Sequence, residues 1–100
     1  MQTMTICGSM KFEKEMQEIA FALETKHGYN VLQCIGGLQK DLLSPENIHT
    51  LEKAHLKKIE ISDAIFVVDI DGYIGDMTKK EIEFAKRHDK AVLYYSEYPL

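Results

Sequence analysis

The chain has 100 residues, a length that suits one domain spanning residues 1–100. Hydrophobic residues make up 45% and charged residues 28%, which is typical of a soluble globular domain and excludes a disordered or fibrous chain. The net charge of −4 argues against nucleic acid or an anionic membrane as a partner. No metal-ligand spacing surrounds the two cysteines, Cys7 and Cys34, so we expect free thiols in the cytoplasm and no metal or cofactor.

The N-terminal segment has the pattern of a strand followed by a helix. Residues 3–7 predict a strand that ends at Gly8, and Ser9 has the hydroxyl of a helix N-cap. No basic region followed by a long apolar stretch precedes them, so we expect no signal peptide. The helix would bury one apolar face, formed by Phe12, Met16, Ile19 and Leu23.

A second strand and a second helix follow. Gly28 predicts the end of the first helix, and residues 30–35 predict a strand that Gly36 and Gly37 break. Ser44, followed by proline and glutamate, begins a helix that runs to about residue 61. Its inner stripe would be Ile48, Leu51, His55 and Ile59.

The C-terminal part repeats the alternation. Residues 64–69 are an apolar, β-branched run that suits a strand buried on both faces and is far too short to span a bilayer. A loop over residues 71–76 leads into a helix that ends near residue 88, and residues 90–95 predict the last strand. The inward residues of this helix would be Ile82, Ala85 and Phe84.

The order of elements is therefore β-α-β-α-β-α-β, which implies parallel strands joined by right-handed crossovers. We expect a small α/β, doubly wound, flavodoxin-like three-layer sandwich with a four-stranded parallel sheet in the order 2-1-3-4. Ligands of such folds bind beyond the carboxyl ends of the strands, between the first and third. This rule selects three loops: Gly8–Ser9, residues 34–37 and residues 69–78.

The third of these loops carries the acidic residues Asp69, Asp71, Asp76 and Glu81. Carboxylates held close together raise one another's pKa and can supply a proton donor beside an ionised group. The alternatives are structural: Asp71 would serve a turn and Asp76 would be an N-cap. Glu81 would then be a solvated helix residue paired with a neighbouring lysine or arginine.

Two other features also have a structural and a functional interpretation. Gly8–Ser9 could bind an anion or a sugar hydroxyl through backbone N–H groups, or could simply cap the helix. His55 lies in an apolar stripe, where a histidine is more often a satisfied core residue than a catalyst, although its titration range suits proton transfer. Cys7 is expected to be a small buried hydrophobic residue.

Three segments resemble the nucleoside 2-deoxyribosyltransferase-like family. Residues 6–12 (ICGSMKF) are similar to its opening strand and loop, and residues 62–69 (SDAIFVVD) to its third-strand signature. Residues 73–85 (YIGDMTKKEIEFA) resemble its glycine-rich loop and following helix. The resemblance implies a homodimer or larger assembly that acts on a nucleoside or nucleotide.

The resemblance also implies a mechanism. In that family a glutamate attacks the anomeric carbon of a deoxyribose and displaces the base, and another base or water then takes the sugar. Glu81 matches this nucleophile, and Asp69 and Asp76 would hold sugar hydroxyls or handle the proton. The remaining substrate contacts would come from Gly8, Ser9, Phe12, His55, Asp71, Tyr73, Gly75 and Thr78.

Several departures from the family keep other functions open. Glu83 and Met77 stand where the family usually has small residues, and His55 stands where the transferases carry aspartate. The chain also stops at Leu100, before a C-terminal residue that completes the site of a neighbouring subunit in the transferases. Transfer and hydrolysis are equally compatible with the residues, and the alternatives are a non-catalytic nucleotide-binding module or a small interaction domain.

Overall fold

Strands and helices alternate along the chain in the predicted order. The computed structural model describes residues 1–35 and 42–99, so the predicted break at Gly36 and Gly37 lies outside the described residues. Two short 3-10 turns, η1 and η3, precede α1 and α3. The elements are β1 (Thr3–Gly8), η1 (Met10–Phe12), α1 (Glu13–His27), β2 (Asn30–Leu32), α2 (Pro45–Glu60), β3 (Ala64–Val68), η3 (Ile70–Gly72), α3 (Asp76–Arg87) and β4 (Ala91–Tyr94).

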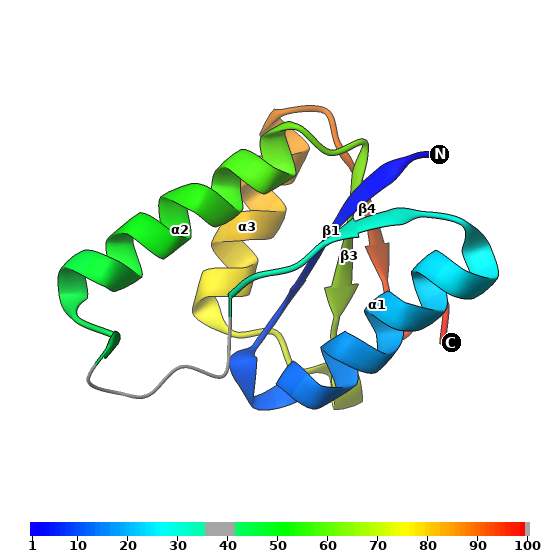
Figure 1. Ribbon diagram of the computed structural model, residues 1–100, viewed down its shortest axis with the longest axis horizontal. Helices are drawn as coiled ribbons and strands as arrows, with labels where there is room; N and C mark the ends of the chain where they lie inside the picture. Colours follow the sequence, from blue (N-terminus) through cyan, green and yellow to red (C-terminus); the bar gives the residue numbers. More distant parts are fainter. Residues whose placement is uncertain (36–41, 100) are drawn as a thin grey trace.

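All strand pairs of the sheet are parallel, and the strand order is β2-β1-β3-β4, which confirms the predicted topology. The central pair aligns Ile6 with Phe66 and Gly8 with Val68, so β1 and β3 end at the same edge. Helix α1 covers one face, whereas α2 and α3 cover the other (Figure 1). The chain is therefore a three-layer, flavodoxin-like α/β sandwich.

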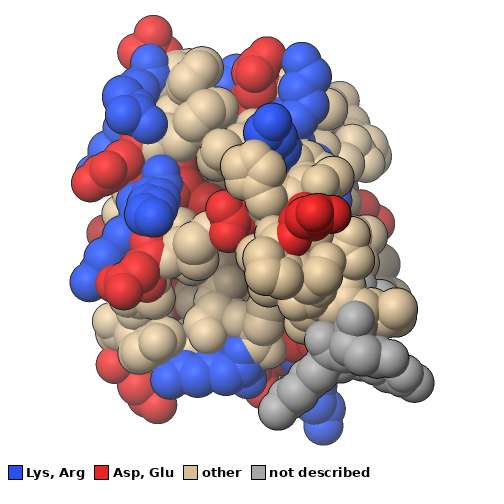
Figure 2. All heavy atoms as spheres, turned by 90° about the vertical axis from the view of Figure 1, so that its left-hand side faces the viewer, with Lys and Arg blue, Asp and Glu red and all other residues tan. Residues whose placement is uncertain are grey.

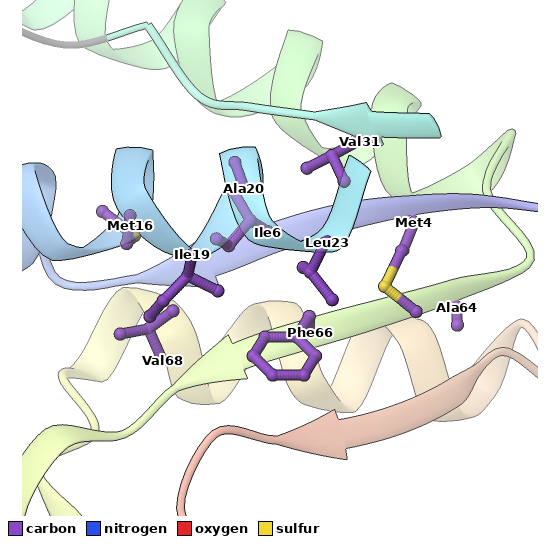
Figure 3. Packing of buried hydrophobic residues seen from close by; sticks show 10 residues of the cluster. All are labelled: Met4, Ile6, Met16, Ile19, Ala20, Leu23, Val31, Ala64, Phe66 and Val68. Atoms are coloured by element: carbon purple, nitrogen blue, oxygen red, sulfur yellow. The ribbon is translucent and has the colours of Figure 1, made fainter. Parts of the chain in front are cut away.

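Alternation along the strands divides the core into two layers. Met4, Ile6 and Phe66 pack toward α1 (Figure 3). The intervening residues of β1 and β3 pack against α2 and α3, and Cys7 is among them, with no exposed surface. The period of two thus places the Cys7 thiol on the α2/α3 side of the sheet.

The first helix and the second strand differ slightly from the predicted bounds. Ser9 caps η1, where its Oγ accepts a hydrogen bond from the Lys11 N–H at 3.4 Å, and α1 begins only at Glu13. Gly28 ends α1 with a φ of 71°, as predicted. Strand β2 ends at Leu32, because it lies at the sheet edge and pairs only with β1 up to that residue.

Helix α2 begins as predicted, with Ser44 Oγ accepting a hydrogen bond from the Asn47 N–H at 3.1 Å. Its expected inner stripe divides into two parts. His55 and Ile59 are buried, whereas Ile48 is 42% exposed. The first turns of α2 therefore do not reach the core; they border a pocket. Within the described residues, no helix is both long and apolar enough to cross a membrane.

Candidate functional site

A pocket of about 370 Å³ opens at the edge where β1 and β3 end, between α2 and the start of α3. This is the edge at which a doubly wound sheet binds its ligands. Charged side chains of both signs are mixed over the α2 side of the molecule, with uncharged side chains gathered between them (Figure 2). The described lining residues are Gly8, Ser9, Met10, Cys34, Ile35, Ile48, Leu51, Glu52, His55, Gly75, Asp76, Met77, Thr78 and Glu81.

The fold brings most of the predicted site residues to this pocket and leaves the others outside its lining. Those at the pocket are Gly8, Ser9, His55, Gly75, Asp76, Thr78 and Glu81. Those outside are Phe12, Asp69, Asp71 and Tyr73. Of the predicted loop 34–37, Cys34 contributes to the lining, and residues 36 and 37 lie outside the described part of the chain.

Three side chains from different elements meet at the inner wall of the pocket: His55 from α2 and Glu81 from α3 line it, and Cys7 from β1 lies buried against them. His55 Nε2 lies 3.5 Å from Cys7 Sγ and 3.5 Å from Glu81 Oε1. The ligand atoms of all three side chains lie within 4.8 Å of one another. A thiol, an imidazole and a carboxyl group are thus in mutual contact beside the pocket.

The thiols at this wall are held in their neutral form. Burial is the main cause that raises the pKa of Cys7 well above its usual value, and the charge of Glu81 and a hydrogen bond to it add to the effect. Burial and then the charge of Glu81 also raise the pKa of Cys34. Because the thiolate is the reactive form, this environment argues against Cys7 as a nucleophile.

His55 is buried, but it is not fully hydrogen-bonded. Its Nε2 is within hydrogen-bond distance of Cys7 Sγ at 3.5 Å, whereas the 3.5 Å to Glu81 Oε1 is longer than a typical N–H···O hydrogen bond of about 2.7–3.2 Å. Its Nδ1 has no hydrogen-bond partner among the described residues. A buried ring nitrogen without a partner costs free energy, so His55 does not behave as a satisfied core histidine.

Glu81 and Glu83 have different surroundings although both belong to α3. The Glu81 side chain is only 16% exposed and faces His55 across the pocket wall, so it is not the solvated helix residue of the structural interpretation. Glu83 is exposed and does not line the pocket. The charge that departs from the family pattern therefore points away from the candidate site.

The other three predicted acidic residues, Asp69, Asp71 and Asp76, lie in different surroundings. Gly75 is the N-cap of α3 and Asp76 its first helical residue, so the expectation that Asp76 would be the cap is wrong by one position. Asp69 is buried and accepts hydrogen bonds from the Ser96 N–H at 2.9 Å and the Ser96 Oγ at 2.6 Å. Asp71 is exposed, with a φ of 55°, as expected of a turn residue.

The two predicted aromatic residues lie side by side outside the pocket lining. The rings of Phe12 and Tyr73 meet edge to face, with centroids 6.0 Å apart. Lys11 places its Nζ 3.4 Å from the centroid of the Tyr73 ring, a cation–π contact. These contacts tie η1 to the segment that leads into α3.

The sequence interpretation did not assign Cys7, Glu52 or an apolar rim to the site. The rim is formed by exposed side chains: Met10, Ile35, Ile48 and Met77. The alternation of side chains along β1 could have indicated that Cys7 points to the face of the sheet opposite Ile6, but its contact with His55 and Glu81 depends on where α2 and α3 cross the sheet.

No family model matches the chain, and no curated protein matches it.

Proposed function

We propose that the protein is a cytoplasmic enzyme that cleaves the N-glycosidic bond of a nucleoside or nucleotide, with Glu81 as the nucleophile. The observation that carries the proposal is the position of Glu81, a largely buried carboxylate at the inner wall of a pocket of about 370 Å³. This volume lies within the range of about 300–1,000 Å³ for small-molecule sites. The resemblance of residues 73–85 to the nucleoside 2-deoxyribosyltransferase-like family supports the same role.

The reaction proceeds in two displacements. A Glu81 oxygen attacks the anomeric carbon while the bond from that carbon to the base nitrogen breaks, and the electron pair leaves with the base. Asp76 lines the pocket and is the carboxyl group that we assign to protonating the base, since Asp69 binds Ser96. Water or a second base then attacks the glycosyl ester, loses a proton and restores the Glu81 carboxylate.

The lining suggests how a nucleoside would lie. The apolar rim, which includes Met10 and Met77, offers surface to a planar base. Sugar hydroxyls would meet Ser9 and the first N–H groups of α3, which Gly75 cannot cap with a side chain. Gly8 contributes backbone to the same wall.

The charge of the lining favours a nucleoside over its monophosphate. Among the described lining residues, Glu52, Asp76 and Glu81 carry carboxylates, and none is lysine or arginine. A phosphate dianion would be repelled by the carboxylates of Glu52 and Glu81 in a partly desolvated pocket. We therefore expect faster base release from deoxynucleosides than from their 5′-monophosphates.

The first test measures base release by chromatography from a panel of deoxynucleosides. Glu81→Gln keeps the size of the side chain and removes its nucleophilic charge, so we expect turnover to fall by at least about 1,000-fold, or about 4 kcal/mol in activation free energy. Glu83→Gln is the matched control, because Glu83 is exposed on the same helix. Unchanged turnover in Glu81→Gln would contradict the assignment.

The alternative of a nucleotide-binding module is favoured by Met77, which lines the pocket where the family has a smaller residue. Calorimetric binding of a nucleoside without base release would support it. The homodimer or larger assembly implied by the family stays a prediction.

A further inference from the structure

The inner wall of the pocket combines three kinds of metal-binding group. Cys7 provides sulfur, His55 a ring nitrogen and Glu81 a carboxylate oxygen, and these atoms all lie within 4.8 Å of one another. We infer that Cys7, His55 and Glu81 form a binding site for a zinc ion, with one coordination position open to the pocket. This inference goes beyond glycosidic cleavage and does not depend on it.

The two separations that involve His55 match the edges of a tetrahedral zinc site, and the third, between Cys7 Sγ and the Glu81 carboxylate, is at most 4.8 Å. With Zn–S of about 2.3 Å and Zn–N or Zn–O of about 2.0–2.2 Å, neighbouring ligand atoms are about 3.4–3.6 Å apart. His55 Nε2 lies 3.5 Å from Cys7 Sγ and 3.5 Å from Glu81 Oε1. The Nε2–Oε1 separation is also longer than a good N–H···O hydrogen bond, so it matches an edge of a coordination polyhedron better than a direct hydrogen bond.

The three groups are held in place by the fold. Cys7 is fully buried in a central strand, and His55 is 6% exposed in the middle of α2. Glu81 lies in the second turn of α3, with its side chain 16% exposed. Side chains buried this deeply have few alternative rotamers, so little conformational entropy is lost when an ion binds.

The donor set also indicates which ion would bind. A thiolate and an imidazole favour Zn²⁺ over Mg²⁺ or Ca²⁺, which prefer oxygen ligands. Three protein ligands with a fourth position left to water or a small molecule are the usual arrangement of catalytic rather than structural zinc. His55 and Glu81 both line the pocket, so the fourth position would be reached from it.

Binding has two chemical consequences. Cys7 must lose its proton to become a thiolate, so each ion that binds releases one proton from the thiol to the solvent. The ion also takes up the Glu81 carboxylate, which is then not available to attack a sugar. Zinc occupancy and the proposed glycosyl transfer are therefore mutually exclusive.

The test titrates the full chain, freed of metal by a chelator, with Co²⁺ as a spectroscopic substitute for Zn²⁺. We expect one Co²⁺ per chain, intense visible bands of tetrahedral geometry and a near-ultraviolet thiolate charge-transfer band, all removed by Zn²⁺ and unaffected by excess Mg²⁺. The weak spectrum of hexahydrated Co²⁺, or the absence of a charge-transfer band, would overturn the inference.

Variants identify the ligands. Glu81→Gln should weaken Co²⁺ binding by more than about 100-fold, because loss of a ligand costs at least as much as loss of a supporting hydrogen bond. Cys7→Ser should remove the charge-transfer band, and circular dichroism checks that this buried substitution leaves the fold intact. If it does not, Glu81→Gln and His55→Gln decide the question.

Cys34→Ser is the matched control. Cys34 lines the pocket, and its Sγ lies 3.5 Å from Met10 Sδ rather than within the Cys7–His55–Glu81 cluster. We expect this variant to retain the spectrum, and its loss would overturn the ligand set. Base release is assayed separately, so a failure of the proposed enzyme and a failure of the metal site remain distinct results.

Discussion

The substitution Asp69→Ala tests whether a carboxylate next to the candidate site stabilises the fold or takes part in the chemistry. The family resemblance assigns it to the sugar or to a proton, whereas the structure shows it buried and bonded to Ser96. These roles predict different outcomes for Asp69→Ala. The structural role predicts a loss of stability with base release per folded molecule retained, and the catalytic role predicts the reverse.

The size of the effect follows from the two hydrogen bonds. A hydrogen bond to a charged group contributes about 1.5–3 kcal/mol, but Ser96 is exposed and water can replace part of each bond. We therefore expect Asp69→Ala to lower the free energy of unfolding by about 2 kcal/mol. For a domain of this length the melting temperature should fall by roughly 8–16 °C.

Calorimetry and urea unfolding measure this loss, and Ser96→Ala provides the comparison. That variant removes the hydroxyl donor, whose Oγ lies 2.6 Å from Asp69 Oδ2, but keeps the backbone N–H bond, so it should cost about 1 kcal/mol or less. An unfolding midpoint that does not change in Asp69→Ala, together with loss of base release, would refute the structural role.

Two further predictions concern the strand that carries Gly8 and Cys7. Gly8→Ala would place a Cβ 3.0 Å from Met16 Sδ and 3.3 Å from the Val68 Cβ and carbonyl oxygen, so urea unfolding should show a loss of about 1–3 kcal/mol. An unchanged midpoint would mean that Met16 moves aside without cost. With a chelator present, a thiol reagent such as DTNB should modify the half-buried Cys34 in the native protein. The fully buried Cys7 should react only after unfolding in urea. Equal rates for the two thiols would contradict the buried environment of Cys7.

The sequence predicted the fold well because its signals are local. The apolar run over residues 64–68 has the composition of a strand buried on both faces, and all five of its residues are buried. Ser44 and Gly28 mark a helix start and a helix end through capping chemistry that depends only on neighbouring residues. Alternating strands and helices then leave few topologies, and β2-β1-β3-β4 is one of them.

The candidate site was predictable only in part. The rule that ligands bind at the carboxyl ends of parallel strands selected Gly8, Asp76 and Glu81, which lie at the pocket. It also selected Asp69 and Asp71, which lie outside the pocket lining. This part of the prediction failed because proximity to the strand end in the sequence does not tell which way a side chain points. Asp69 turns to Ser96, a residue 27 positions away that the sequence gives no reason to pair with it.

The cluster of Cys7, His55 and Glu81 was likewise not predictable from the sequence. Sequence spacing indicated no metal site around Cys7, because His55 and Glu81, which lie beside it in space, are 48 and 74 positions further along the chain. Local patterns determine the elements, since helices and strands are stabilised by neighbouring residues and by one apolar face. Only the packing of α2 and α3 on the sheet decides that a thiol, an imidazole and a carboxylate meet, because crossing positions depend on side-chain packing along whole elements.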